Sequence, residues 1–275
     1  MRILEVIEMA LVGIFSDPEL SRQLVLKGGT AMHLFEKMDE RLSTDVDFSS
    51  REGLAEAAIF FDRMKQVLTA AYEPSGLDLF DFQYQRRPKE SKKRPQWWGG
   101  WACKFKLSPH SDRHLKPEQR RRQALIPEGT PSSIIDIEIS DREYVGKPRH
   151  KTLHGVKING YTLALLVVEK LRAICQQHPD YPHRGQKNRA RDLVDIFHLT
   201  RDHQTVAFLE ECKRELPKSF EVKEVDVGLL RGLHEDDFVE MLRAGFPQVR
   251  DTLQGSVYPF ETYLEYIRDF VSKIT

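Results

Sequence analysis

The chain has 275 residues, of which 31% are charged, and its 42 Lys or Arg balance its 42 Asp or Glu to a formal net charge of zero. This length suffices for one or two domains with a sizeable core, and the balanced charge by itself says nothing about nucleic acid. No segment approaches the roughly 20 consecutive apolar residues of a membrane-spanning helix, so we expect no membrane association.

The cysteines and the N-terminal residues bear on the cellular compartment. Cys103, Cys175 and Cys212 lie far apart without a CxxC or zinc-type spacing, so we expect reduced thiols. The apolar N-terminal run contains glutamates and has no small-residue cleavage site, so we expect an amphipathic helix rather than a signal peptide. Both observations favour a cytoplasmic protein.

Helical and strand patterns alternate in the first part of the chain. Apolar residues at helical spacing predict helices over residues 1–16, 18–24, 30–38 and 53–71. Apolar and β-prone stretches predict strands over residues 44–49, 77–84, 97–107, 132–140 and 156–158. Prolines and basic runs predict a loop over residues 108–131.

From Tyr161 onward the pattern is helical only. The predicted helices cover residues 162–178, 188–200, 204–215, 235–245 and 259–273. This change in character predicts an α+β, bilobal protein. We expect a lobe with a mixed sheet and helices over residues 1–158 and a helical lobe over residues 159–275.

The stretch from Leu24 to Ser49 carries the first candidate site. Its apolar run ends in Lys27-Gly28-Gly29-Thr30, where two glycines allow the backbone to approach a bulky anion. A glycine turn into a helix also directs free N–H groups, including that of Thr30, towards a phosphate. We therefore expect Gly28, Gly29 and Thr30 to bind a nucleotide.

Asp45 and Asp47 follow in the same stretch. In a strand they project from one face. Two carboxylates at such a short distance repel each other unless a cation lies between them. Oxygen ligands suit Mg²⁺ or Mn²⁺, so we interpret the pair as metal ligands. The alternative is two surface aspartates on an edge strand. Ser43 or Thr44 would add a hydroxyl to the nucleotide site.

The predicted strand over residues 132–140 supplies two further acids. Asp136 and Glu138 lie opposite to an apolar face, which is unusual unless they line a cleft. If this strand neighbours the Asp45 strand, one of the two completes a three-carboxylate metal site, and we favour Asp136. A half-solvated sheet face is the alternative.

Lys170 lies in an apolar stripe of its predicted helix, which is costly unless the side chain reaches solvent or is paired. Its charge suits nucleotide phosphates. Asp192, on the next predicted helix, would orient it, whereas Asp195 is as well explained as a cap or a structural acid. A solvent-reaching lysine is the alternative interpretation.

A basic segment runs from Arg86 to Arg122, with thirteen Lys or Arg against three acids. It also contains Trp97, Trp98 and Trp101, and cations with aromatic rings suit RNA phosphates and unpaired bases. Tryptophans packed in the core are the alternative. The candidate RNA-binding residues are Arg86, Arg87, Lys92, Lys93, Arg94, Arg120, Arg121 and Arg122.

Five motifs together resemble the nucleotidyltransferase family of the AbiEii/AbiGii toxins, within the DNA polymerase β-like superfamily. They are Leu26–Ala31, Arg41–Phe48, Ile135–Ile137, Glu169–Ala173 and Arg191–Ile196. They occur in the family's order, although Arg191 stands where the family more often has lysine before Asp192. The C-terminal 75 residues carry no matching motif.

The resemblance implies a polymerase-β-like first lobe and Mg²⁺-dependent transfer of a nucleotide from an NTP. It also implies a toxin of a toxin–antitoxin or phage-defence (abortive infection) operon, with an antitoxin encoded nearby. Mycobacterial relatives add pyrimidine nucleotides to the 3′ end of tRNA and block aminoacylation. By motif position, the catalytic residues would be Asp45, Asp47, Lys170 and Asp192.

The mechanism that combines these expectations is a two-metal in-line attack by the tRNA 3′-hydroxyl. Asp45, Asp47 and Asp136 would hold the metals, and Lys170 would neutralise the nucleotide phosphates. Three alternatives remain: transfer to a protein hydroxyl, an inactive nucleotide- or RNA-binding regulator, and a metal-dependent nuclease.

Overall fold

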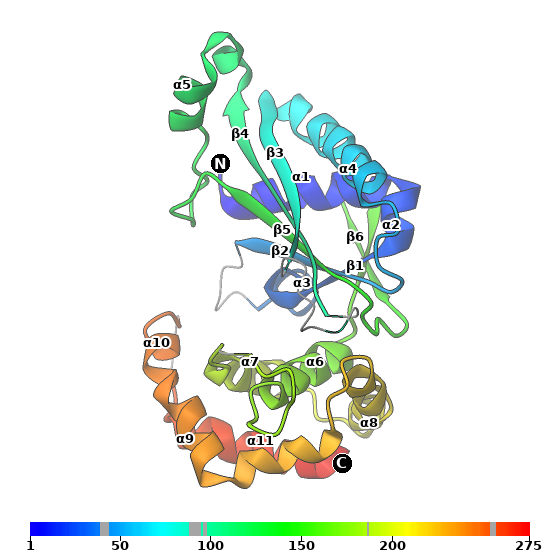
Figure 1. Ribbon diagram of the computed structural model, residues 1–275, viewed down its shortest axis with the longest axis vertical. Helices are drawn as coiled ribbons and strands as arrows, with labels where there is room; N and C mark the ends of the chain where they lie inside the picture. Colours follow the sequence, from blue (N-terminus) through cyan, green and yellow to red (C-terminus); the bar gives the residue numbers. More distant parts are fainter. Residues whose placement is uncertain (39–43, 88–94, 96–97, 186, 254–256) are drawn as a thin grey trace. The chain divides into compact units, whose positions relative to one another are not determined.

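The computed structural model describes residues 1–38, 44–87, 95, 98–185, 187–253 and 257–275, and it has a mixed α/β architecture (Figure 1). The chain divides into two compact units. One comprises Met1–Lys37 and Leu42–Gly160, and the other comprises Met38–Arg41 and Tyr161–Thr275. Within the described residues, no helix combines the length and the apolar composition needed to cross a membrane.

Seven strands of the described chain form one sheet in the first unit, in the order β3-β4-β5-β2-β1-β7-β6. The sheet is mixed, because β2 pairs with β5 and β1 pairs with β7 in parallel, whereas the other neighbours are antiparallel. The strands are β1 (Leu24–Lys27), β2 (Asp45–Ser50), β3 (Leu77–Arg87), β4 (Gly100–Pro109), β5 (Ile135–Ser140), β6 (Arg149–Leu153) and β7 (Val156–Gly160).

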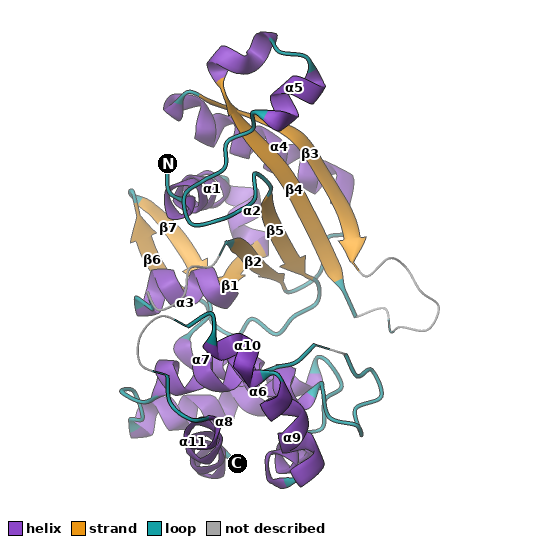
Figure 2. Cartoon of the chain, turned by 90° about the vertical axis from the view of Figure 1, so that its left-hand side faces the viewer, coloured by secondary structure: helices purple, strands orange, loops and turns teal. Residues whose placement is uncertain are grey.

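The first unit also contains helices, which lie beside the sheet (Figure 2). They are α1 (Ile3–Ser16), α2 (Pro18–Gln23), α3 (Gly28–Glu36), α4 (Ala57–Tyr72) and α5 (Pro117–Arg122), with short 3₁₀ turns at Glu73–Ser75 and His110–His114. α3 packs on β1 and β2, whereas α1 and α4 pack on each other.

The core of the first unit lies between the sheet and the helices α1 and α4. Phe15 of α1 lies 6.0 Å from Phe48 of β2, and Phe61 of α4 lies 5.6 Å from Trp101 of β4, measured between ring centroids. Phe48 and Trp101 project from the same face of the sheet, because Ile139 of β5 is the register partner of both. One face is thus apolar and covered, which leaves the acidic residues of β2 and β5 on the other.

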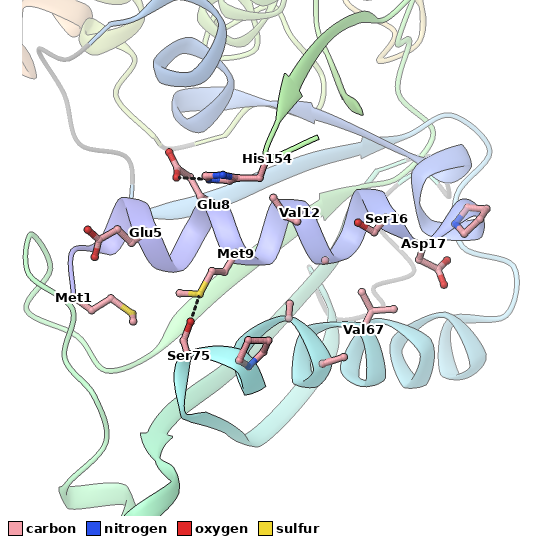
Figure 3. Close-up of a pocket in the computed structure, with 15 residues that line it drawn as sticks. Met1, Glu5, Glu8, Met9, Val12, Ser16, Asp17, Val67, Ser75 and His154 are labelled. Carbon is pink, nitrogen blue, oxygen red and sulfur yellow. Dashed lines mark hydrogen bonds and ion pairs between the residues drawn. The ribbon is translucent and has the colours of Figure 1, made fainter. Parts of the chain in front are cut away.

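A groove of about 890 Å³ lies along α1 and α4 (Figure 3). Met9, Val12 and Val67 contribute apolar lining, and Ser75 Oγ donates a hydrogen bond to Met9 Sδ at 3.2 Å. The predicted site residues that the structure describes do not line this groove.

The second unit consists of helices joined by loops over its described residues (Figure 2). They are α6 (Leu163–Cys175), α7 (Ala190–Thr200), α8 (Val206–Glu221), a 3₁₀ helix (Val227–His234), α9 (Asp236–Ala244), α10 (Phe246–Arg250) and α11 (Phe260–Ile274). α6 packs on α7 and α8, and α11 packs on the same two helices. The α+β class and the change to an all-helical second part agree with the sequence-based prediction.

The structure corrects two local predictions and adds a strand that was not predicted. The helix predicted from Thr30 begins at Gly28 and ends at Glu36, where Lys37 adopts a left-handed conformation with φ of 56°. The predicted loop over residues 108–131 contains α5, which begins with Pro117 in its first turn, a position that proline favours. β6 was not predicted, because this edge strand buries no face and so has no apolar alternation.

Candidate active site

β2 presents Asp45 and Asp47 on one face and buries Val46 and Phe48 on the other. The alternation of two apolar and two acidic residues produces this arrangement, because successive side chains of a strand point to opposite faces. Asp45 is exposed and Asp47 is partly buried. The predicted common orientation of the two aspartates is therefore present.

Gly28 lies directly against Asp47. A Cβ atom at residue 28 would lie 2.2 Å from Oδ2 of Asp47, and the φ of Gly28 is +65°. Lys27, the preceding residue, is the register partner of Asp47 in the antiparallel β1–β2 pair. Only glycine meets both requirements, so residue 28 is set by the neighbouring carboxylate as well as by the turn.

The start of α3 provides the predicted phosphate-binding groups. Gly28, Gly29 and Thr30 form its first turn, where backbone N–H groups have no intrahelical acceptor. The buried Thr30 hydroxyl instead donates to the backbone oxygen of Asp45 at 2.8 Å. Thr30 thus anchors the start of β2, and the N-cap of α3 is Lys27.

Of the two predicted hydroxyl contributors, the structure describes Thr44. Thr44 Oγ1 donates to Oδ1 of Asp45 at 3.4 Å, which places it beside the first aspartate. Ser43 lies outside the described residues.

β5 lies beside β2, as the third-carboxylate hypothesis required. The strands are parallel, with Asp136 opposite Asp45 and Glu138 opposite Asp47. The side chain of Asp136 is 18% exposed and that of Glu138 is 51% exposed. The two strands therefore carry four carboxylates as two cross-strand pairs, which lie two residues apart along each strand.

Asp136 and Glu138 each have a basic partner. Lys104 Nζ of β4 lies 2.7 Å from Asp136 Oδ2, and Arg87 Nη1 of β3 lies 3.6 Å from Glu138 Oε1. The other oxygen of Asp136, Oδ1, is buried without a hydrogen-bond partner. A buried oxygen in that state is costly, and a bound cation would satisfy it.

The donor set fits a divalent cation in its chemistry. Among the residues that the structure describes, no group of three or more His, Cys, Asp or Glu side chains is already gathered as a metal site. The carboxylates of Asp45, Asp47 and Asp136 would nevertheless offer oxygen ligands of the kind that Mg²⁺ and Mn²⁺ prefer. The unpartnered oxygen of Asp136 is the structural observation that supports this fit.

Lys170 of α6 forms an ion-paired cluster with two aspartates of α7 inside the second unit. Its Nζ lies 3.0 Å from Asp192 Oδ1 and 2.6 Å from Asp195 Oδ2, and the three side chains are 13%, 11% and 4% exposed. Burial by itself would lower the pKa of Lys170, but Asp195 and Asp192 outweigh it and raise the pKa above its usual value. The lysine is therefore charged and held in place.

Asp195 is the member of this cluster that the sequence-based site did not include. Its position at i+3 from Asp192 was the available signal, since residues three apart share a helix face. Arg189 Nη1 also approaches Asp192 Oδ2, at 3.4 Å. The predicted Lys170–Asp192 pair is present, and Asp195 makes the shorter contact.

Two acids of β3 neutralise part of the basic segment. Asp78 accepts from Arg113 at 2.6 and 2.7 Å and from Arg120 at 3.2 Å, and Asp81 accepts from Arg121 at 2.6 and 3.0 Å. The arginine hydrogen bonds lower the pKa of both aspartates. Both acids lie just outside the Arg86–Arg122 range, so the charge count over that range did not include them.

The remaining candidate RNA-binding residues include one ion-paired arginine and one exposed arginine. Arg86 pairs with Asp141 at 3.0 Å and lies over the Trp101 ring at 5.7 Å. Trp101 itself packs against Phe61, which agrees with the core alternative for this tryptophan. Arg122 is exposed. The predicted residues Lys92, Lys93 and Arg94 lie outside the described part of the chain.

The sequence matches the model of a protein family described as the nucleotidyl transferase AbiEii toxin of a type IV toxin–antitoxin system, over residues 10–266. None of the curated proteins matches the chain. Two similar solved structures are JHP933 from Helicobacter pylori and MenT4, a nucleotidyltransferase toxin from Mycobacterium tuberculosis.

Both solved structures are distant from this chain, with 16% identity each. JHP933 has a TM-score of 0.47, with 98% of this chain and 89% of that chain covered. MenT4 has a TM-score of 0.48, with 98% of this chain and 82% of that chain covered. The family match spans most of the sequence, and the chain therefore belongs to the AbiEii nucleotidyltransferase toxin family of type IV toxin–antitoxin systems.

Proposed function

We propose that this toxin transfers a nucleoside monophosphate, with a preference for pyrimidines, from an NTP to the 3′ end of tRNA and so blocks translation. The observation that carries the proposal is the pairing of β2 with β5. It sets Asp45 opposite Asp136 in the unit where Gly28 lies against Asp47. Carboxylates and helix-start amides in one unit are the parts that metal-assisted nucleotidyl transfer needs.

In this proposal Asp45, Asp47 and Asp136 would hold Mg²⁺ or Mn²⁺, which would supply positive charge near the triphosphate and the acceptor hydroxyl. The backbone N–H groups of Gly28 and Gly29 bind the phosphates, because the start of a helix favours anions. Thr30 holds the backbone of Asp45 through its hydroxyl. The role of Lys170 and Asp192 in nucleotide binding stays a prediction.

The acceptor is proposed from the family resemblance and from the basic residues. Arg122 is exposed, and Arg121 is half exposed even though Asp81 binds it. Exposed arginines bind an RNA backbone without sequence preference. A cytoplasmic location follows from the tRNA substrate, and an antitoxin encoded nearby follows from the family.

The test incubates the purified protein with Mg²⁺, total tRNA and each α-³²P-labelled NTP in turn. We expect label in RNA, most from CTP or UTP. Asp47→Asn should reduce transfer at least about a hundredfold, the factor that roughly 3 kcal/mol of lost transition-state stabilisation produces. Asp62→Asn is the matched control, because Asp62 is an exposed aspartate on α4 with the same loss of charge.

The outcomes separate the rival functions. Label in protein rather than RNA would favour transfer to a protein hydroxyl. Bound NTP with no transfer to either acceptor would favour an inactive regulator. Shortened RNA that requires Asp47 but no NTP would favour a nuclease.

A further inference from the structure

Four side chains form one row across the polar face of the sheet. The register pairs Gln83 of β3 with Lys104 of β4, Lys104 with Asp136 of β5, and Asp136 with Asp45 of β2. Paired residues of adjacent strands project from the same face. Lys104 is thus the basic member of the row that contains two of the proposed metal ligands.

Lys104 and Asp136 are in direct contact. Their Nζ and Oδ2 atoms are 2.7 Å apart, and the two side chains are 36% and 18% exposed. The contact engages only one oxygen of Asp136, since Oδ1 is buried without a hydrogen-bond partner. Lys104 therefore fixes the carboxylate through one oxygen and leaves the other for a further cation.

The lysine offsets charge repulsion within the row. Asp136 lies opposite Asp45, and neighbouring carboxylates repel each other unless a positive charge lies close. The Lys104 ammonium provides that charge within the chain itself. A divalent cation bound to the same carboxylates would bring two positive charges to the place where one is already present.

We propose that Lys104 is a positioning residue for nucleotidyl transfer, which orients Asp136 and competes with the divalent cation for it. The expected effect on nucleotide transfer rests on the proposed function. The expected effect on Mn²⁺ affinity rests on the strand register alone. Loss of the lysine has two opposite effects: the carboxylates bind a divalent cation more tightly, and Asp136 loses the contact that fixes its orientation.

Lys106 offers a matched comparison on the same strand. It lies two residues beyond Lys104, and its charge contributes to lowering the pKa of Asp81. Lys106→Met removes the same charge and the same ammonium group as Lys104→Met. Its effect on the Asp45–Asp136 pair should be small, because Asp81 is not a proposed ligand.

The experiment measures Mn²⁺ binding to the full chain, without nucleotide, by electron paramagnetic resonance and by calorimetry. We expect Lys104→Met to tighten Mn²⁺ binding roughly tenfold, because one positive charge beside the ligands is removed. Lys104→Arg should keep the wild-type affinity, and Lys106→Met should change it less than about twofold. Thermal melts of the variants identify those that fail to fold. If Lys104→Met fails to fold, Lys104→Gln replaces it, because that substitution also removes the positive charge.

The activity readout runs in the opposite direction. NMP transfer at saturating Mn²⁺ should fall about tenfold or more in Lys104→Met and recover substantially in Lys104→Arg. It should fall much less in Lys106→Met, because Lys106 belongs to the basic segment but not to the row with Asp136 and Asp45. Weaker or unchanged Mn²⁺ binding in Lys104→Met would overturn the inference, as would equal effects of Lys104→Met and Lys106→Met. No measurable Mn²⁺ binding to the wild type or to any variant would overturn it as well.

The two proposals can fail separately. If the wild type transfers no nucleotide but Lys104→Met still binds Mn²⁺ more tightly, the proposed function fails and the competition between Lys104 and the cation stands. If transfer to tRNA occurs but Lys104→Met leaves both affinity and turnover unchanged, the proposed function stands and the role of Lys104 fails.

Discussion

Gly28 and Asp47 occupy adjoining space so closely that a Cβ atom on Gly28 would overlap Oδ2 of Asp47, at 2.2 Å. The relationship links the glycine turn to the paired aspartates, two motifs that are 19 residues apart. In the first unit, the start of α3 and the end of β1 are shaped around one carboxylate. The geometry of that carboxylate is therefore sensitive to any side chain at residue 28.

Gly28→Ala should impair transfer far more than it impairs folding. Both Gly28 and Gly76 have positive φ, at +65° and +71°, but a Cβ at Gly76 would meet nothing within 4 Å. Each alanine costs about 1 kcal/mol of stability for its backbone conformation, and only Gly28→Ala also displaces Asp47. Urea unfolding and a transfer assay measure the two effects.

Gly76→Ala is the control for the backbone cost alone. We expect near-normal transfer in Gly76→Ala and at least about a tenfold loss in Gly28→Ala, which a misplaced catalytic group readily causes. Equal activity of the two variants would show that the carboxylate of Asp47 tolerates the displacement.

Lys170→Met should destabilise the second unit. The substitution leaves Asp192 and Asp195 buried without their lysine, and breaking a buried ion pair in this way costs about 3–5 kcal/mol. Arg189, near Asp192, offsets part of the cost. Adding Asp195→Asn to Lys170→Met should recover stability, as a double-mutant cycle by urea unfolding measures.

The pH dependence of this cluster has a defined sign. The pKa of Lys170 is raised in the folded protein, so its stabilising contribution is complete below the unfolded value of about 10.4. That contribution is lost only as the pH rises through the folded pKa. The difference in stability between wild type and Lys170→Met should therefore be constant from pH 7 to 9. A steep change within that range would contradict a raised pKa of Lys170 in the folded protein.

Asp78→Asn and Asp81→Asn should each strengthen RNA binding if the basic segment contacts the acceptor. Each substitution removes a carboxylate that pairs with arginines, namely Arg113 and Arg120 for Asp78 and Arg121 for Asp81. The released cations would be available to RNA phosphates, and the affinity would fall more steeply with salt. Filter binding of tRNA at several salt concentrations measures both changes.

Two controls accompany that measurement. Asp62→Asn removes one exposed carboxylate from α4 and should leave the salt dependence unchanged. Arg122→Gln should weaken binding. Unchanged tRNA affinity in both aspartate variants would argue against this surface as the RNA site.

Asp78 also contributes to the pH dependence of stability. The Arg113 hydrogen bond lowers the pKa of Asp78, so the stabilisation by the ionised carboxylate is present above about pH 4 and is lost as the pH falls through the folded pKa. In acid unfolding, Asp78→Asn should therefore lose less folding stability below about pH 4 than the wild type does.

The three cysteines should react slowly with alkylating reagents in the native protein. Cys103, Cys175 and Cys212 are all buried and free. Burial raises the pKa of each thiol, to about 12 for Cys212, so little thiolate exists at neutral pH. Iodoacetamide labelling followed by mass spectrometry should show little modification at pH 7.5 and complete modification in urea. Rapid native labelling of any of the three would contradict this expectation.

Much of the fold and of the site follows from local patterns in the sequence. The alternation around Asp45 and Asp47 predicts a strand with both acids on one face, and the Ile135–Ile139 pattern predicts a second such strand. The helical spacing around Lys170 and Asp192 predicts their pairing across two helices. Such predictions succeed because they depend on periods of two or 3.6 residues, which the chain carries locally.

The tertiary structure decided which of these groups meet. Strand order set Asp136 opposite Asp45 and brought Lys104 to Asp136, and the turn before α3 placed Gly28 against Asp47. Helix packing set Asp195 closer to Lys170 than Asp192. These contacts join residues that are distant in the chain, so no local period specifies them. They follow from the burial of the apolar faces, which selects one strand order and one packing of the helices.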